Sequence, residues 1–164
     1  FCEFAVFEER ELEEAVFSPG RVIWKAEGVS DQVGCPQKTS EQKMHPSPEW
    51  LIGEALTNLY VGLSRELRGE KLSAMRFIQG YAVDQVLELA MRLTTTERTS
   101  RDEFSFERRF EGRYPTLARL LPQFLQSYGR NRESALAILS YLDENFEINP
   151  AMKQAVLEIC RQKI

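Results

Sequence analysis

The feature that most constrains the fold is a stripe of apolar residues at helical spacing, which begins after residue 47 and runs to residue 93 with one interruption. Its first part consists of Ile52, Leu56, Leu59, Leu63 and Leu67, and its second part of Met75, Ile78, Ala82, Val86, Leu89 and Leu93. The motif Arg68-Gly69-Glu70 separates the two parts. Apolar residues three or four positions apart lie on one face of an α-helix. Because the interruption is short, we expect two long antiparallel helices that pack along these faces.

Helix boundary signals support this pattern and extend it. The motif Ser47-Pro48-Glu49 offers an N-cap, a proline in the first helical position and an acid in the first turn. A third helix is predicted over residues 114–129. It should bend or restart at Pro122, because proline lacks the N–H that the helix needs there.

Two further helices complete the predicted architecture. Asn131 is predicted to cap a fourth helix that reaches Phe146, and the pair Asn149-Pro150 to open a fifth that reaches the C-terminus. The expected fold class is mainly α, an up-and-down bundle of four to five helices over residues 48–164.

The segment before the bundle has a different composition. Residues 1–7 and 21–26 are rich in Phe, Val, Ile and Trp and predict short strands, while residues 7–17 predict a short acidic helix. We interpret residues 1–27 as terminal strands of a sheet. Residues 28–47 lack periodicity and predict a surface loop. Since the first strand begins at residue 1 and no Met precedes it, we expect a piece of a longer chain whose partner strands lie upstream.

Composition narrows the class of function. Lys and Arg number 21 against 25 for Asp and Glu, so no large positive field exists to attract nucleic acid or anionic lipid. The three cysteines are far apart in sequence and lack the spacing of a zinc site or a disulfide framework, which favours a cytoplasmic setting. No apolar stretch approaches the roughly 20 residues of a membrane-spanning helix. We therefore expect no nucleic-acid partner and no membrane partner.

Glu3 is the first candidate for chemistry. Alternation along the expected strand places it on the face opposite to Cys2 and Phe4. A carboxylate on a strand can act as a general base or as a metal ligand beside other acids. The alternative is an ordinary solvent-facing residue at a frayed terminus.

Polar residues also recur at helical spacing on the two long helices, and these could line a pocket. They are Glu54, Asn58, Gly62 and Arg65 on the first helix and Ser73, Arg76, Gly80 and Asp84 on the second. Tyr60 and Tyr81 could stack on a flat ligand, although helical aromatics also serve as core or rim. Glycine disfavours helix, so Gly53, Gly62 and Gly80 suggest that something packs close to them. The alternative is a solvated face with close helix contacts.

Taken in order, these segments resemble a known family. The strand CEFAVF, the acidic helix, GRVIWKA and then EWLIGEALTNLYVGLSRELRGEKLSAMRFIQGYAVDQVLELA resemble the C-terminal half of antibiotic nucleotidyltransferases, especially the lincosamide group. The similarity covers most of residues 1–93 and thins to a matching helical pattern beyond. Its sharpest features are the Glu in the strand and the Arg68-Gly69-Glu70 break.

The resemblance implies a mixed-sheet catalytic domain followed by a helical substrate-binding bundle. Such enzymes transfer a nucleoside monophosphate from a nucleoside triphosphate to a drug hydroxyl. Two acids in an Asp-x-Asp or Asp-x-Glu motif after a Gly-Ser turn hold Mg²⁺, and a third carboxylate acts as general base; Glu3 matches that third acid. No Gly-Ser followed by Asp-x-Asp occurs in these 164 residues. The metal ligands would therefore lie outside this chain, which should be inactive alone.

On this basis we predict Glu3 as the catalytic base and a hydroxyl-bearing small molecule as the acceptor. The residues predicted to bind the acceptor are Glu54, Asn58, Tyr60, Tyr81 and Asp84. Arg65 and Arg68 are predicted to bind the nucleoside triphosphate, and a homodimer is possible from the family. The alternative is a non-catalytic helical interaction or dimerisation module, the partner subunit of a split nucleotidyltransferase.

Overall fold

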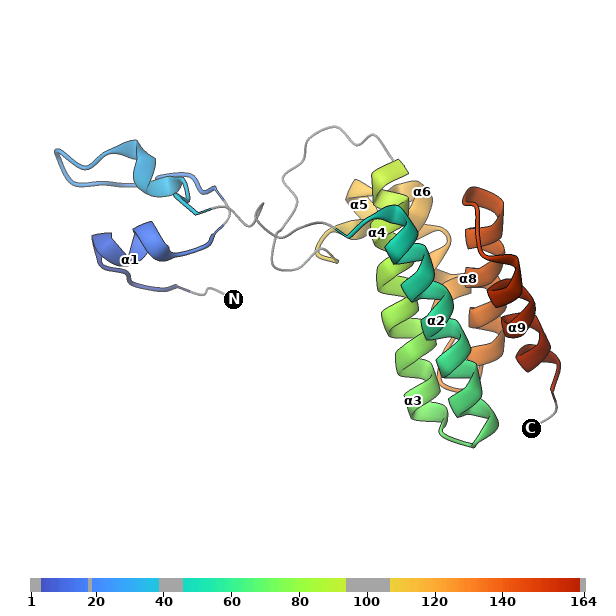
Figure 1. Ribbon diagram of the computed structural model, residues 1–164. Helices are drawn as coiled ribbons and strands as arrows, with labels where there is room; N and C mark the ends of the chain where they lie inside the picture. The colour runs from blue at the N-terminus through green and yellow to red at the C-terminus, as the bar shows by residue number, and fades with distance from the viewer. Residues whose placement is uncertain (1–3, 18, 39–45, 94–106, 163–164) are drawn as a thin grey trace. The chain divides into compact units, whose positions relative to one another are not determined.

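The computed structural model describes residues 4–17, 19–38, 46–93 and 107–162. The chain divides into two units, one with residues 1–45 and 100–108 and the other with residues 46–99 and 109–164. The second unit is a bundle of helices, α2 to α9, most of which are labelled in Figure 1. Glu3, the predicted catalytic base, lies outside the described residues.

The described part of the first unit contains a short α-helix, a 3₁₀ turn and one β-bridge. Helix α1 (Glu9–Glu14) matches the predicted acidic helix, and a capping box formed by Glu8 and Glu11 begins it. A 3₁₀ turn, η1 (Asp31–Gly34), lies in the segment that was expected to be a loop. Val16 and Lys38 form an isolated parallel bridge.

The structure shows no strand at residues 4–7 or 21–26, where the sequence predicted them. A strand is stable only when its backbone pairs with a neighbour, and the described part of this unit offers one bridge. The apolar side chains of these segments are correspondingly exposed, with Phe4 at 90% and Trp24 at 82%.

The bundle begins with α2 (Pro48–Leu67), as predicted. The Ser47 hydroxyl accepts a hydrogen bond from the Trp50 N–H at 3.2 Å, which confirms the expected N-cap. Gly69, at φ 78°, makes the turn that ends the helix. The buried residues on its inner face include Leu56, Leu59 and Leu63, whereas Ile52 and Leu67 are half-buried.

The second long helix consists of three consecutive segments. They are α3 (Lys71–Met75), η3 (Arg76–Ala82) and α4 (Val83–Leu93), of which η3 is π-helical. The extent of the helix agrees with the prediction, whereas the π-helical segment was not predicted. Figure 1 shows α3 and α4 antiparallel to α2, and α2 packs against all three segments.

Gly62 explains how closely these two helices approach. A Cβ atom at this position would lie 2.5 Å from Cγ1 of Ile78, which is closer than real side chains allow. Added Cβ atoms at Gly53 and Gly80 would meet nothing within 4 Å. The expectation that another helix packs close is therefore confirmed for Gly62 and wrong for Gly53 and Gly80.

The predicted third helix, residues 114–129, is broken into single turns, α6 (Pro115–Ala118) and α7 (Leu121–Phe124). Another single turn, α5 (Phe110–Arg113), precedes it. Tyr114 precedes a proline, which disfavours the helical conformation there, and it adopts φ −130°. Pro122 in turn cannot donate to the carbonyl of Ala118, so a helix that starts at Pro115 cannot continue unbroken.

Two long helices end the chain, α8 (Asn131–Asn145) and α9 (Pro150–Arg161). Asn149 caps α9 as predicted, because its side chain accepts from the N–H groups of Ala151 and Met152. The predicted cap at Asn131 is wrong: Arg130 occupies the cap position, and Asn131 is 1% exposed with its side chain bonded inside the bundle.

The core of the bundle lies between α2, the second long helix, α8 and α9, which confirms a mainly helical protein. Its largest fully buried side chains include Leu51, Leu59, Ile78, Leu89, Ile138, Leu142 and Val156. Among the residues that the structure describes, no helix combines the length and apolar character needed to cross a membrane.

Candidate functional site

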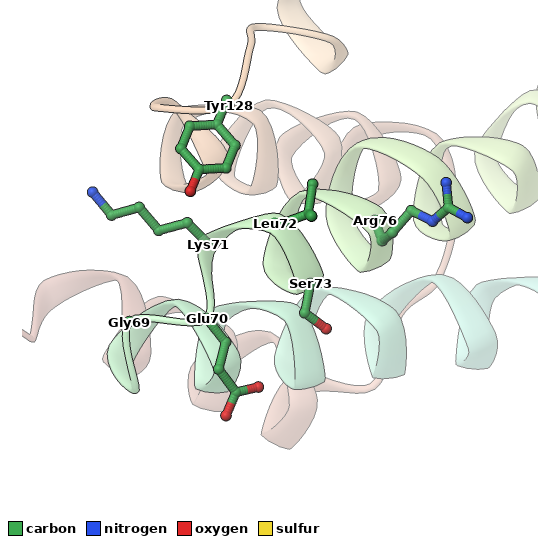
Figure 2. A pocket seen from close by; sticks show the side chains of 7 residues that line it. All are labelled: Gly69, Glu70, Lys71, Leu72, Ser73, Arg76 and Tyr128. Atoms are coloured by element: carbon green, nitrogen blue, oxygen red, sulfur yellow. The ribbon is translucent and has the colours of Figure 1, made fainter.

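One pocket of the bundle lies at the turn between α2 and α3. It has a volume of about 620 Å³. The residues that line it are Gly69, Glu70, Lys71, Leu72, Ser73, Arg76 and Tyr128. Figure 2 shows the ring of Tyr128, from the loop before α8, on one side, and Glu70 and Ser73 on the other. Segments almost 60 residues apart in the sequence therefore form its walls.

Glu70 is the one acid of this pocket, and two arginines neutralise it. Its carboxylate lies 2.8 Å from Nε of Arg68 and 3.4 Å from Nη1 of Arg65. The hydrogen bond from Arg68 is the main reason why the pKa of Glu70 lies below its ordinary value. Two further contacts fix Arg65. Its Nη1 donates a hydrogen bond to Ser73 Oγ at 2.9 Å, and its guanidinium lies 4.8 Å from the ring centroid of Phe77.

Two cations of the pocket are left without such a partner. Neither Lys71 nor Arg76 forms an ion pair or a side-chain hydrogen bond with another described residue. Both side chains are exposed. Since Glu70 is already paired, the pocket presents positive charge to a ligand.

A buried polar network lies behind the pocket. Asn131 donates to the Glu66 carboxylate at 2.7 Å, and its carbonyl oxygen accepts from the Gln79 amide at 2.8 Å. Glu66 is only 4% exposed, and within the described part of the chain it forms no ion pair. A buried carboxylate with one neutral donor is unusual, because burial of a charge is normally offset by a cation or several hydrogen bonds.

The same network holds a strained residue next to the pocket. Ser127 has φ 108°, a conformation that residues with a side chain rarely adopt. The Gln79 side chain binds both backbone groups of Ser127, accepting from its N–H at 3.0 Å and donating to its carbonyl at 2.8 Å. Gln79 lies in the π-helical segment η3, and π-helical turns are frequent at functional sites.

The two residues that were predicted to bind the nucleotide, Arg65 and Arg68, both form ion pairs with Glu70 at the edge of this pocket. Arg68 is exposed, and its pair with Glu70 raises its pKa above the ordinary value. Arg65 is half-buried between Ser73 and Phe77. Both are near the pocket without lining it, so a nucleotide role for them stays a prediction.

The five predicted acceptor-binding residues do not gather around a described pocket. Asn58 is buried in α2, while Glu54 is half-buried and Tyr60 is 40% exposed. On the second long helix, Tyr81 is exposed and its ring meets that of Phe77 edge-on, with centroids 5.4 Å apart; Asp84 is exposed as well. Phe77 thus contacts both Arg65 and Tyr81, and an acceptor-binding role stays a prediction for all five residues.

Sequence reasoning missed the polar network, although a signal was present. Glu66 follows Leu59 and Leu63 at helical spacing, and Gln79 falls between Ile78 and Ala82 on the apolar face of the next helix. A polar residue on an apolar face requires a buried partner. Nothing in the sequence indicated Asn131 as that partner, since it looked like a cap.

Two other pockets lie elsewhere in the bundle. One, of about 250 Å³, is lined by Leu136, Leu139, Ser140, Asp143, Lys153 and Leu157. Its two charges neutralise each other, with Lys153 Nζ 2.6 Å from Asp143. The other is lined by Pro48, Glu49, Ile52, Asn145, Phe146, Glu147, Ile148, Asn149 and Pro150. Neither one presents a buried polar network of the kind behind the α2–α3 pocket.

No group of three or more His, Cys, Asp or Glu side chains could hold a metal ion within the described ranges. Glu3 and the intervals 39–45 and 94–106 fall outside those ranges. The resemblance assigns the two Mg²⁺ ligands to a segment that these 164 residues do not contain, so it requires no metal cluster in the bundle.

Comparison with family models, with curated proteins and with solved structures found no match to this chain. The site must therefore be interpreted from its own geometry together with the sequence resemblance described above.

Proposed function

We propose that this chain is the substrate-binding portion of a nucleotidyltransferase, an enzyme that transfers a nucleoside monophosphate from a nucleoside triphosphate to a hydroxyl of an antibiotic-like small molecule. The supporting observation is the pocket at the Arg68-Gly69-Glu70 turn. This motif is one of the sharpest features of the sequence resemblance. The pocket at it carries positive charge on Lys71 and Arg76, neither of which is paired with another residue that the structure describes.

In this proposal the residues of the chain bind and orient. Arg65 and Arg68 face the triphosphate, while Glu70 keeps their guanidinium groups in place in its absence. Tyr81, whose ring packs on Phe77, gives the acceptor a flat surface. Glu54, Asn58, Tyr60 and Asp84 offer further polar groups to it.

Glu3 would accept the proton from the acceptor hydroxyl, which makes the oxygen a better nucleophile. Mg²⁺, held by residues outside this chain, would neutralise the charge of the triphosphate when bound. Residues 1–7 and 21–26 would form strands once neighbouring strands pair with them. The distant cysteines, of which Cys35 and Cys160 are free, favour the cytoplasm.

The proposal expects an in-frame segment upstream of Phe1, and it is tested by expressing the chain together with that segment and assaying nucleotide transfer. With Mg²⁺, a labelled nucleoside triphosphate and a lincosamide or an aminoglycoside, label should appear on the drug. Glu3→Gln should lower the rate by at least about 100-fold, the usual contribution of a general base. Glu49→Gln, at the start of α2, serves as control. Transfer that is absent, or unaffected by Glu3→Gln, would refute the proposal.

The second candidate is a non-catalytic helical interaction or dimerisation module. Exposed apolar side chains in the first unit favour it, namely Phe4, Val6, Ile23 and Trp24. The coding DNA upstream of Phe1 discriminates between the two functions: an in-frame Gly-Ser turn followed by Asp-x-Asp favours the enzyme, and a nearby start codon favours the module. Sedimentation of the chain would show whether it forms a homodimer.

A further inference from the structure

We infer that the pocket at the α2–α3 turn binds a small molecule that joins a flat apolar group to a phosphate or carboxylate. The inference deepens the proposed function and rests on it for the identification of this pocket as a substrate site. It follows from three properties of the pocket: its charge, its apolar wall and the rigidity of its frame.

The charge of the pocket selects an anion. Arg65 and Arg68 satisfy the carboxylate of Glu70, so this acid does not compensate the remaining cations. Lys71 and Arg76 have no described partner. Figure 2 shows their side chains extended away from Leu72 in opposite directions, so each would turn inward to contact an anion bound over Leu72. A charged side chain that turns inward to contact the anion loses conformational entropy. We therefore expect only modest affinity for the anionic group alone.

The apolar wall selects the rest of the ligand. Leu72 is 66% exposed and Tyr128 is 54% exposed, although both are large apolar side chains at the pocket. In Figure 2 the ring of Tyr128 stands beside Lys71 and Leu72 with its hydroxyl directed toward the pocket. A flat group placed against this ring would cover both side chains and remove apolar surface from water.

The frame of the pocket is fixed from behind. The amide nitrogen of Asn131 lies 3.2 Å from the backbone carbonyl of Lys71 and 3.4 Å from that of Tyr128, so one side chain ties the two walls together. Gln79 fixes the neighbouring Ser127 by two hydrogen bonds, in a conformation that would otherwise relax. A preformed pocket needs less ordering when its ligand binds.

The test is a titration of the isotope-labelled 164-residue chain with naphthyl phosphate, followed by amide chemical shifts. We expect saturable shifts at residues 69–76 and 128, with a dissociation constant on the order of 1 mM or tighter. Inorganic phosphate, which lacks the apolar group, should bind at least about tenfold more weakly. Naphthoate replaces phosphate by carboxylate, and the tighter of the two probes identifies the anionic group.

Variants separate the two contributions. Lys71→Gln and Arg76→Gln should each raise the dissociation constant of naphthyl phosphate about tenfold, because each variant removes a charge-assisted contact. Arg119→Gln removes an exposed cation outside the pocket and should change nothing. Tyr128→Ala should weaken the binding of naphthyl phosphate and leave the binding of inorganic phosphate unchanged.

The inference fails if naphthyl phosphate produces no saturable shifts, if the shifts lie elsewhere, or if Arg119→Gln weakens binding as much as Arg76→Gln. It also fails if neutral naphthol binds as tightly as the phosphate. The probe carries no nucleoside and the titration involves no transfer. Failure of the nucleotidyltransferase proposal in its own assay is therefore distinguishable from failure here.

Discussion

The two units of this chain differ in how they treat apolar residues. In the bundle, side chains such as Leu59, Leu63 and Ile78 are completely buried. In the first unit, Phe4 and Trp24 are almost completely exposed, although the sequence around them is just as apolar. The difference shows that apolar content alone does not make a core.

The physical reason lies in the backbone. A helix satisfies its own N–H and C=O groups, so an amphipathic helix needs only another apolar face to pack against. A strand needs a neighbouring strand for every second backbone group as well. The bundle contains both partners of each packed pair, whereas the described part of the first unit supplies only the bridge between Val16 and Lys38.

The sharpest test of this comparison removes one apolar side chain from each unit. Leu63→Ala should lower the free energy of unfolding of the bundle by about 2–5 kcal/mol, because it leaves a cavity in a closed core. Ile23→Ala, at an exposed position of the first unit, should change it by less than about 0.5 kcal/mol. Urea unfolding followed by helical circular dichroism measures both. Similar losses for both variants would contradict the comparison.

Close packing at Gly62 gives the next largest effect. Gly62→Ala should destabilise the bundle by about 1–3 kcal/mol, since the added Cβ overlaps Ile78. Gly53→Ala is the matched control in the same helix, where space is open. It should stabilise by about 0.5–1 kcal/mol through helix propensity. The same unfolding measurement applies, and a stabilising Gly62→Ala would mean that α2 and η3 are not in close contact.

The polar network should contribute less to the free energy of unfolding than the apolar core does, but more than any ion pair on the surface. Asn131→Ala leaves the Glu66 carboxylate and the Gln79 amide without their partner, and it should cost about 1–3 kcal/mol. Asn145→Ala, which removes an exposed amide from the other end of α8, should stay within about 0.5 kcal/mol. If Asn131 acted only as a helix cap, Asn131→Ser would restore full stability; the network predicts that it does not.

The ion pair at Glu70 should give the smallest effect, and it depends on pH. The pKa of Glu70 in the folded chain lies below its ordinary value of 4.5, mainly because Arg68 donates a hydrogen bond to it. The pair therefore stabilises the fold above pH 4.5, and this contribution disappears as the pH falls through the lowered pKa. The midpoint temperatures of thermal unfolding of the wild type and of Glu70→Gln should differ slightly at neutral pH and become equal in acid. A difference that persists in acid would assign the effect to something other than the charge.

The sequence anticipated most of the helices because helix formation is governed by neighbours in the chain. The caps at Ser47 and Asn149 and the turn at Gly69 depend on residues within four positions, and all three were predicted correctly. The interruption of the third helix was only partly expected. A break was predicted at Pro122 alone, whereas Pro115 also interrupts the helix.

The site was less predictable, since its residues come from segments that are distant in sequence. Arg65 was chosen from the polar stripe of the first helix and Arg68 from the break after it, and both lie at the edge of the pocket. No local pattern indicated that Tyr128 lines the same pocket. The role of Ser127 depends on Gln79, which lies 48 positions away. Local patterns contain no information about such pairs.

Asn131 shows most clearly where the sequence ends and the tertiary structure decides. Its residue type and position at the start of α8 were sufficient to locate a helix boundary, because amides are common there. Whether its side chain capped that helix or entered the interior depended on Glu66 and Gln79, which only folding brings within hydrogen-bond distance. The helices of this protein follow from local backbone preferences, and its pocket follows from buried polar groups that must find partners across the bundle.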